Sequence, residues 1–395
     1  MKIIAIHTHF IQYNTCIFQR LSEKFDLNVL LLSKLNTPVD FSNDISISVD
    51  QGFGKSVNWT NPYEFDKYIY ITNKYSINFN IFLIALSSLK IVSYVCSYKP
   101  KYIILFNHGV LQFCVSAIFR LLHIPYLIRT EVVPQRYLPS SPLVFLRSLF
   151  LCLYYKHAAK VYTINSSAQR YLFSIGVPLS KVNICNYSHD TFQHRVDHEV
   201  ASESKTAIRK FYNIKEDEYV LLYSGRLASE KNIFCVHEAL SLIPELERSN
   251  LRFISMGAGP LEEEWERRMK SLMGDKFINI SFIKQDKIFE IYSIANALVL
   301  PSSFNETWGL VLNEAIASDC IIFASSACGA STELRSLGND VRIFTASSPL
   351  QLSDLIRFWI FCPTFSLKAE IREFPSSNTF IDQLTNDLDS LGSNV

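Results

Sequence analysis

The alternation of short apolar stretches with helix-length segments constrains this chain more than any other feature. Residues 2–6, 27–32 and 102–106 are continuously or nearly continuously apolar, the pattern of strands buried on both faces of a parallel sheet. Segments long enough to be helices follow them, and the same alternation runs again over residues 219–324. The sequence therefore predicts an α/β protein in which parallel sheets carry helices on both faces.

The individual elements can be placed from the same pattern. The predicted strands are residues 2–6, 27–32, 102–106, 125–129, two stretches around Val161 and Val182, and residues 219–224, 251–256, 278–283, 298–300 and 320–324. The predicted helices are residues 13–25, 81–97, 111–122, 144–157, 166–174, 233–242, 262–273, 287–295 and 309–317. A loop containing Gly and Asn, which includes residues 50–59, is expected after the second strand.

The apolar pattern stops around Asp190. Residues 190–205 are polar and predict an exposed linker between two domains. A chain of 395 residues is long enough for two domains with a core each. We expect two Rossmann-like, doubly wound domains, residues 1–195 and 196–375, that face each other across a ligand cleft.

Composition narrows the class of protein further. Hydrophobic residues make up 48% of the chain and charged residues 19%, so most of it is expected to fold. The formal net charge of +1 suggests no nucleic-acid partner. Nine cysteines without a C-x-x-C pair predict reduced, mostly buried thiols in a cytoplasmic protein, with neither a disulfide framework nor a zinc site.

Three segments are apolar enough to be tested as membrane spans. Residues 77–95, 110–128 and 143–155 are each short or interrupted by polar residues, which favours buried helices. The basic and aromatic residues of segment 143–160 leave a second interpretation open, a helix that lies on a membrane surface. The N-terminal residues predict a strand and not a signal peptide.

A first candidate ligand loop is residues 224–232, between a strand and a helix. Gly225 permits a tight turn, and Arg226 and Lys231 place two cations near a helix N-terminus, where anions are already favoured. This combination indicates a phosphate or diphosphate site, and the alternative is a solvated loop. The next strand ends at Gly257-Ala-Gly259, which without a third glycine is a strand-to-helix turn as readily as a cofactor loop.

Two glutamates stand eight positions apart around the start of the predicted helix 309–317. Carboxylates at such positions accept hydrogen bonds from ribose or sugar hydroxyls. Glu314 lies among apolar residues, which favours burial near a ligand over a solvated surface position. Glu306 precedes the helix, and we expect the positive end of the helix dipole to hold it in the cleft. Two acids so placed also suggest paired-carboxylate hydrolysis.

In the first half, residues 107–109 and 129–131 follow two predicted strands and are expected at the same sheet edge. His108 is a candidate there, although a single histidine is more often structural. The sequence contains no G-x-S-x-G, H-E-x-x-H or Walker A motif, which excludes the corresponding serine hydrolases, zinc proteases and P-loop NTPases.

Taken together, these motifs resemble the signature set of the family-4 retaining glycosyltransferases, also called group 1. The resemblance covers residues 220–334 and is carried by Gly225-Arg226 through Lys231, Gly257-x-Gly259-Pro260, Glu306-x7-Glu314, and Gly329 through Glu333. The first half is similar to a bacterial surface-polysaccharide subgroup at residues 9–13, 18–30, 52–54, 59, 108–109 and 129–131. It departs from the family at His7-Thr-His-Phe10, where many relatives have two glycines, and at Ala330, where a second glycine is common.

The resemblance implies a GT-B fold, with a C-terminal helix within residues 376–395 that returns to the first domain. Arg226 and Lys231 would bind the diphosphate and neutralise it as it leaves, so that no metal or other cofactor is required. Glu314 would bind the ribose, Glu306 the donor sugar, and His108 would approach that sugar from the facing domain. The remaining implied donor contacts are Gly225, Gly257, Asn305, Thr307, Trp308, Gly309 and Leu310, with Lys284 and Gln285 near the base.

The activity expected from the resemblance is retaining transfer of a sugar from a UDP- or GDP-sugar to a glycan or lipid-linked acceptor. The setting would be bacterial surface-polysaccharide synthesis, in the cytoplasm or at the cytoplasmic face of the inner membrane with a peripheral contact. A GT-B sugar-nucleotide epimerase and a catalytically silent partner of a transferase are the alternatives. A nicotinamide oxidoreductase is disfavoured by the incomplete glycine fingerprint.

Overall fold

The structure, a computed structural model, describes residues 1–7, 14–31, 46–50, 55–59, 67–71, 81–132, 142–187, 201–281, 283, 287–304, 306–365 and 377–392. It divides into two compact units, which are described separately. The first comprises Met1–Ser48, Asn58–Asn186 and Ser377–Val395, and the second comprises Val49–Val57 and Tyr187–Ser376. The predicted boundary at residues 195 and 196 lies outside the described residues.

The first unit is built on a parallel sheet with the order β5-β2-β1-β6-β7-β8-β9. Its central strands are buried along nearly their whole length, as their continuous apolar sequences predict. The strands are β1 (Lys2–His7), β2 (Asp26–Leu31), β5 (Tyr68–Tyr70), β6 (Tyr102–Phe106), β7 (Tyr126–Thr130), β8 (Val161–Thr163) and β9 (Val182–Ile184).

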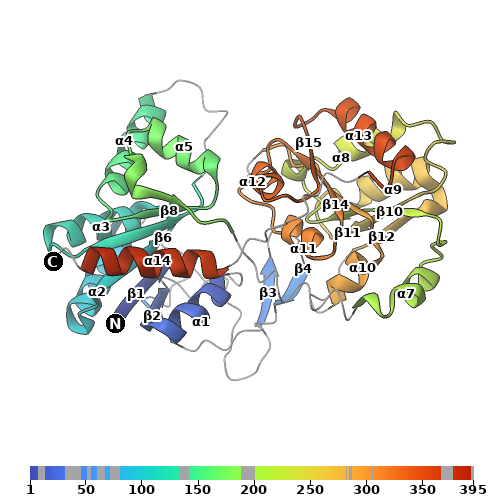
Figure 1. Cartoon of the computed structure of the whole chain (residues 1–395). Coiled ribbons are helices and arrows are strands. Elements are labelled where there is room, and N and C mark those ends of the chain that lie inside the picture. Colours follow the sequence, from blue (N-terminus) through green and yellow to red (C-terminus); the bar gives the residue numbers. More distant parts are fainter. Residues whose placement is uncertain are drawn as a thin grey trace. The chain divides into compact units, whose positions relative to one another are not determined.

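Helices cover both faces of this sheet (Figure 1). Because successive side chains of a strand point to opposite faces, Ile4 and Ile6 of β1 join one core while Ile3 and Ala5 join the other. The helices on the first face are α2 (Ile81–Tyr98), α3 (Val110–Leu121), α4 (Pro142–Lys156) and α5 (Ser166–Ser174), and those on the second are α1 (Thr15–Lys24) and α14 (Ser377–Gly392).

The C-terminal helix α14 therefore packs on the N-terminal sheet, although more than 180 residues of the second unit separate it from β9 in sequence. Its apolar residues Phe380, Ile381 and Leu384 are buried in the core that also contains β1. The hydroxyl of Tyr162 donates a 2.8 Å hydrogen bond to the carboxylate of Asp387, which fixes the helix to β8.

The second unit repeats the architecture with a parallel sheet in the order β12-β11-β10-β13-β14-β15. The strands are β10 (Tyr219–Ser224), β11 (Leu251–Met256), β12 (Phe277–Ile280), β13 (Ala297–Leu300), β14 (Ile321–Ser325) and β15 (Val341–Phe344). The helices are α7 (Lys205–Phe211), α8 (Phe234–Ser241), α9 (Glu262–Met273), α10 (Ile288–Ile294), α11 (Val311–Ala317), α12 (Ser331–Ser336) and α13 (Pro349–Phe361). The 3₁₀ turn η3 (Ser229–Lys231) lies between β10 and α8.

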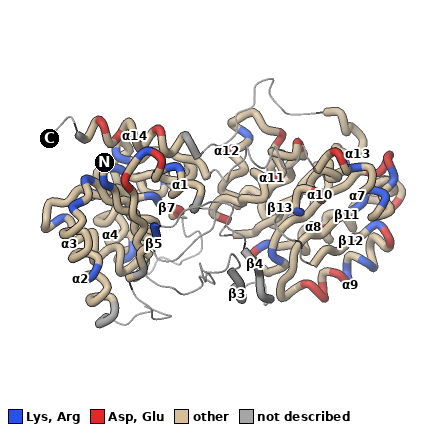
Figure 2. The backbone as a smooth tube through the Cα atoms, turned by 90° about the horizontal axis from the view of Figure 1, so that it is seen from below, with Lys and Arg blue, Asp and Glu red and all other residues tan. Residues whose placement is uncertain are grey.

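Helix α9 of the second unit is amphipathic, as expected for a helix with one face on a sheet. On α9, Trp265 and Met269 are buried in the core, while acidic residues in the first part of the helix and basic residues in the second lie outside that core (Figure 2). These outer residues form ion pairs along the helix between Glu264 and Arg268 and between Glu266 and Lys270. The α/β class with two doubly wound sheets is thus confirmed.

Most predicted elements are present with ends displaced by one or two residues, and some predictions are wrong. Residues 55–59 are not loop: β4 (Lys55–Trp59) pairs with β3 (Ser46–Asp50) in a two-stranded sheet. Helix α7 begins at Lys205, within the predicted linker 190–205, of which residues 190–200 lie outside the described part. The elements β15, α12 and α13 have no predicted counterpart.

Two general predictions concern helices and thiols. Among the described residues, none of the helices combines the length and the apolar character needed to cross a membrane. All nine cysteines are free thiols, and five of them are buried. Burial raises the pKa of Cys185 to about 12 and that of Cys235 to about 11, so both are thiols at neutral pH.

Candidate functional site

The loops that follow β10 and β11 touch each other through their backbones. The amide of Gly225 donates to the carbonyl of Met256 at 2.9 Å, and the amide of Leu227 donates to that of Ala258 at 2.9 Å. A Cβ on Gly257 would lie 2.0 Å from the carbonyl oxygen of Gly225, and the φ of Gly257 is +143°. Glycine is therefore required at position 257 by contact between the two loops, independently of any ligand.

The two candidate cations stand on this loop with acids beside them. The guanidinium of Arg226 pairs with the carboxylate of Glu230, four residues further on in the chain. The hydroxyl of Tyr223 donates a 2.8 Å bond to the carbonyl of Arg226 and fixes the backbone there. Glu230 in turn uses its own carbonyl to accept from the amide of Ser303 at 3.1 Å. The loop after β10 is thus joined to the loop after β13.

The second cation, Lys231, forms an ion pair with Glu306. The carboxylate of Glu306 also accepts a 2.8 Å hydrogen bond from the hydroxyl of Ser302. Glu306 lies five residues before α11, whose N-cap residue Leu310 has no side-chain hydrogen bond. A lysine and a serine thus hold Glu306 directly, and the contribution expected from the helix dipole stays a prediction.

The segment between β13 and α11 is fixed against the loop after β14. Glu306 forms an isolated parallel bridge with Cys328, and its carbonyl accepts from the amide of Gly329 at 2.9 Å. Trp308 is buried, and its indole N–H donates to Asn313 at 2.9 Å. Gly309 has a φ of +93°, and a Cβ on it would lie 2.8 Å from Leu300. Position 309 therefore requires glycine.

Glu314 is the fourth residue of α11, so it lies in the first turn of that helix. Its carboxylate accepts a 2.7 Å hydrogen bond from the hydroxyl of Tyr292 on α10. Burial raises the pKa of Glu314 above its usual value, and the bond from Tyr292 opposes that rise. The carboxylate keeps further acceptor positions for hydroxyl donors, which suits a ribose or sugar.

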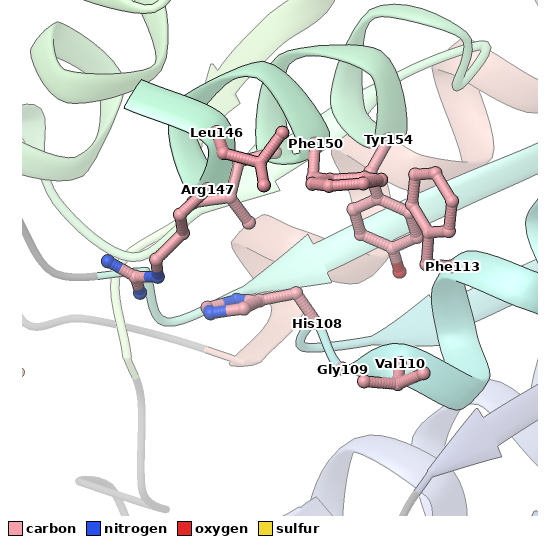
Figure 3. A pocket seen from close by; sticks show the side chains of 9 residues that line it. His108, Gly109, Val110, Phe113, Leu146, Arg147, Phe150 and Tyr154 are labelled. Atoms are coloured by element: carbon pink, nitrogen blue, oxygen red, sulfur yellow. The ribbon is translucent and has the colours of Figure 1, made fainter. Parts of the chain in front are cut away.

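His108 belongs to the first unit. Asn107, at the end of β6, adopts a left-handed conformation with φ +62°, its amide donates to the carbonyl of Arg129 at 2.7 Å, and its side chain accepts from the amide of Glu131 at 3.1 Å. The next residue, His108, shares a 3.1 Å hydrogen bond between Nδ1 and the hydroxyl of Tyr155. Burial and the charge of Arg147 lower the pKa of His108, so the ring is neutral at pH 7. It lies at one end of a pocket between α3 and α4 (Figure 3).

The structure thus brings part of the predicted set together. Gly225, Arg226, Lys231, Gly257 and Glu306 lie on the loops that follow β10, β11 and β13, and Thr307, Trp308, Gly309 and Leu310 continue towards Glu314 on α11. His108 lies in the other unit, and its predicted approach to the donor sugar stays a prediction. Asn305, Lys284 and Gln285 lie outside the described residues.

Three residues that contact the candidate site were missed from the sequence. Glu230 stands between the two cations in the chain, and an acid at that position was a usable signal for an internal partner of Arg226. Ser302 and Tyr292 carry no local signal. Ser302 reaches Glu306 from four residues earlier in the same segment, whereas Tyr292 reaches Glu314 because α10 lies beside α11.

The sequence model of the family described as "Glycosyl transferases group 1" matches residues 204–373, which include the loops just described. Residues 204–373 are a group 1 glycosyltransferase domain. An uncharacterized glycosyltransferase of Methanocaldococcus jannaschii is 26% identical over 174 residues, 44% of this chain and 43% of that protein. The lipopolysaccharide 1,2-N-acetylglucosaminetransferase of Salmonella typhimurium is 32% identical over 132 residues, 31% of this chain and 34% of that protein. The chain therefore matches less than half the length of either relative.

Solved structures resemble this chain over its whole length. A glycosyltransferase from Rickettsia africae has a TM-score of 0.72 at 14% identity and covers 100% of this chain and 99% of its own. HepE from Anabaena, in complex with UDP and glucose, has a TM-score of 0.68 at 15% identity. The match covers 99% of this chain and 100% of HepE. The UDP-GlcNAc 2-epimerase of Methanocaldococcus jannaschii has a TM-score of 0.55 at 14% identity. The match covers 98% of this chain and 100% of the epimerase.

At these identities the likeness concerns the fold alone, and the GT-B fold expected from the sequence is confirmed. An epimerase shares the fold with transferases. The activity of this chain therefore has to be argued from its site.

Proposed function

We propose that this chain is a retaining glycosyltransferase that binds a nucleotide-diphosphate sugar through the loops after β10, β11 and β13. The observation that carries the proposal is the arrangement of Lys231 and Arg226, two cations on one loop, with Glu306 and Glu314 on the neighbouring segments. The cations suit a diphosphate, and the carboxylates suit sugar and ribose hydroxyls. The UDP and glucose bound to HepE, which shares the fold, support a nucleotide-sugar donor.

In the proposed reaction, the bond between the anomeric carbon of the donor sugar and the diphosphate oxygen breaks. A hydroxyl oxygen of the acceptor forms the new bond on the same face of the sugar, and the departing phosphate takes the hydroxyl proton. Negative charge grows on the diphosphate as its bond breaks, and fixed cations directed at that charge lower the barrier. Arg226 and Lys231 take this role, Glu306 contacts the transferred sugar, Glu314 binds the ribose, and His108 contacts the sugar from the first unit.

We further propose that two protein cations make a resident metal unnecessary for this transfer. In many phosphate-transfer sites a divalent metal neutralises the diphosphate, whereas here a guanidinium and an ammonium stand on the candidate loop. Activity is then expected to survive treatment with EDTA. Loss of activity with EDTA, restored by Mg²⁺ or Mn²⁺, would show that the transfer needs a divalent metal and would overturn this proposal.

The acceptor is proposed to be a glycan or lipid-linked glycan of bacterial surface polysaccharide. Two relatives support this class by their printed activities: the lipopolysaccharide transferase of Salmonella typhimurium and the alpha-monoglucosyldiacylglycerol synthase of Acholeplasma laidlawii, the latter 34% identical over 120 residues, 30% of this chain and 29% of that protein. Work on such acceptors would place the chain in the cytoplasm, at the inner face of the membrane.

The test is to incubate the purified chain with a panel of UDP- and GDP-sugars and acceptor extracts and to measure nucleotide release. We expect release with one donor, and NMR of the product gives the anomeric configuration. Arg226→Ala and Glu314→Gln are expected to abolish transfer without changing the circular dichroism spectrum. Conversion of the donor without an acceptor would indicate an epimerase. Turnover by none of the donors, with the chain folded, would leave the silent-partner alternative.

A further inference from the structure

The first unit contains a pocket of about 450 Å³ beside His108. This volume lies within the range of about 300–1,000 Å³ that is usual for small-molecule sites. The pocket lies where the start of α3 meets α4, and its walls are almost entirely apolar. The lining residues other than His108 and Arg147 are Gly109, Val110, Phe113, Leu146, Phe150, Leu151 and Tyr154.

The two ends of the pocket differ in chemistry. The guanidinium of Arg147 and the imidazole of His108 lie towards one end, and the rings of Phe113, Phe150 and Tyr154 gather at the other (Figure 3). Phe113 and Phe150 meet edge to face with their centroids 5.3 Å apart, which fixes the aromatic end. A ligand that fits both ends has an anionic head and an apolar body.

The rim of the pocket continues into an exposed apolar surface. Leu146 and Phe150 line the pocket and are nevertheless 47% and 46% exposed. On the same helix, Phe145, Leu149 and Leu153 are exposed to 76%, 47% and 40%. An apolar chain that leaves the pocket therefore meets more apolar surface before it meets water.

A free glycan fits this pocket poorly, because sugar hydroxyls need several hydrogen-bonding partners. Besides His108 and Arg147, the side chain of Tyr154 is the one polar group among the lining residues, and its hydroxyl donates to the carbonyl of Asn107 at 2.9 Å. A hydrocarbon chain needs no such partners. A guanidinium at the end of an apolar pocket matches a phosphate, which it binds with two parallel hydrogen bonds.

We propose that this pocket binds the hydrocarbon chain of a lipid-linked acceptor, with the acceptor's phosphate at Arg147 and the chain along Phe113 and Phe150. The inference rests on the proposed transferase function and narrows its acceptor from any glycan to one carried on a lipid phosphate. His108 at the polar end then lies on the side of the pocket where the acceptor's sugar follows the phosphate.

The experiment uses dodecyl phosphate below its critical micelle concentration, titrated into the whole purified chain by calorimetry. We expect saturable binding of one equivalent, and affinities for inorganic phosphate and for dodecanol that are each at least about tenfold weaker, since each lacks one half of the ligand. Val110→Trp adds a ring at the pocket wall and is expected to weaken binding at least about tenfold. Arg147→Gln is expected to remove the preference for dodecyl phosphate over dodecanol.

Two matched variants separate the pocket from the apolar surface around it. Leu121→Trp lies on α3 at a position 78% exposed, and Leu149→Trp lies on the exposed face of α4, both outside the pocket lining. Both are expected to bind dodecyl phosphate like the wild type. Equal losses in Leu149→Trp and Val110→Trp would overturn the proposal. The proposal would also be overturned if the chain bound phosphatidylglycerol vesicles but did not bind dodecyl phosphate saturably. That result would indicate that α4 lies on a membrane surface.

The outcome for the acceptor can be told apart from the outcome for the donor. Nucleotide release from a donor sugar, together with no binding of dodecyl phosphate, overturns the lipid pocket and leaves the transferase intact. Saturable binding that Val110→Trp removes, with no turnover of any donor, supports the lipid pocket and overturns the proposed transfer. Analytical ultracentrifugation of the same variants shows whether a second copy of the chain covers the apolar face instead.

Discussion

The ammonium group of Lys231 donates to the carboxylate of Glu306, which also accepts a 2.8 Å bond from the hydroxyl of Ser302. The two charged side chains are 24% and 11% exposed, so the pair is largely removed from water. A carboxylate in such a place depends on its cation, because an uncompensated buried charge is costly. The proposed catalytic lysine therefore has a structural role as well, and mutations must separate the two roles.

Lys231→Met leaves the Glu306 carboxylate with Ser302 but without its cation. We expect the free energy of unfolding to fall by about 1–3 kcal/mol and nucleotide release to fall about 100-fold or more. The double variant Lys231→Met with Glu306→Gln should recover most of the stability, because no charge is left unpaired, and none of the activity. Urea denaturation and a nucleotide-release assay measure the two effects. A double variant as unstable as the single one would contradict this account.

Glu314 makes stability depend on pH. Because burial raises its pKa in the folded chain, the folded state keeps its proton at pH values where the unfolded chain has lost it. Stability therefore falls as the pH rises from the unfolded pKa, about 4.3, through the raised folded value. Glu314→Gln keeps an acceptor for the hydroxyl of Tyr292. Because glutamine does not titrate, the variant should not lose stability as the pH rises through this range. Its stability relative to wild type should be greater at pH 7 than at pH 4, measured by urea denaturation without ligand.

The matched control for that pH series is Glu266→Gln, on the exposed face of α9. Its stability relative to wild type is expected to change little with pH, because its pair with Lys270 is solvated. A constant difference between Glu314→Gln and the wild type from pH 4 to pH 7 would show that Glu314 does not titrate as described.

If Arg226 binds a diphosphate as proposed, Glu230 is expected to compete with that ligand for the guanidinium. The pair is 37% and 27% exposed, and such pairs are worth about 0.2–1 kcal/mol. Glu230→Gln releases the guanidinium, so the affinity for UDP or GDP should rise by about 1.5- to 5-fold in calorimetry. Glu266→Gln removes an acid from a pair of the same sequence spacing on α9 and should leave the affinity unchanged. A weaker affinity in Glu230→Gln would mean that Glu230 positions Arg226 for the ligand.

Gly257→Ala tests the contact between the loops after β10 and β11. Its Cβ would lie 2.0 Å from the carbonyl oxygen of Gly225. Backbone strain of about 1–3 kcal/mol and overpacking of about 1–3 kcal/mol predict that the free energy of unfolding falls by about 2–6 kcal/mol. Gly274 also has a positive φ, +55°, but a Cβ added there would meet nothing within 4 Å. Gly274→Ala should therefore lose only the strain, about 1–3 kcal/mol. Thermal denaturation measures these losses. Equal losses of stability in Gly257→Ala and Gly274→Ala would refute the backbone contact.

Local sequence patterns predicted the framework because the apolar runs of β1, β6, β10 and β11 are long enough to distinguish buried parallel strands. They failed at β3 and β4. In β3, Ile47 and Val49 alternate with serines, which is a usable strand signal, but the two strands lie beside glycines typical of a loop. They also failed at β15, where Arg342, which is buried in the structure, interrupts a short apolar run, whereas β13 of the same length is continuously apolar and was predicted.

The sequence by itself determined the two-sheet α/β architecture and the presence of cations and carboxylates on loops at strand ends, since these depend on residues close together in the chain. Only the tertiary structure decided which charges pair. Lys231 meets Glu306 across 75 residues because β10 and β13 are neighbours in the sheet. It also decided that Tyr292 bonds Glu314 and that α3 and α4 enclose a pocket beside His108. Such contacts depend on the order of strands and the packing of helices, which no local pattern contains.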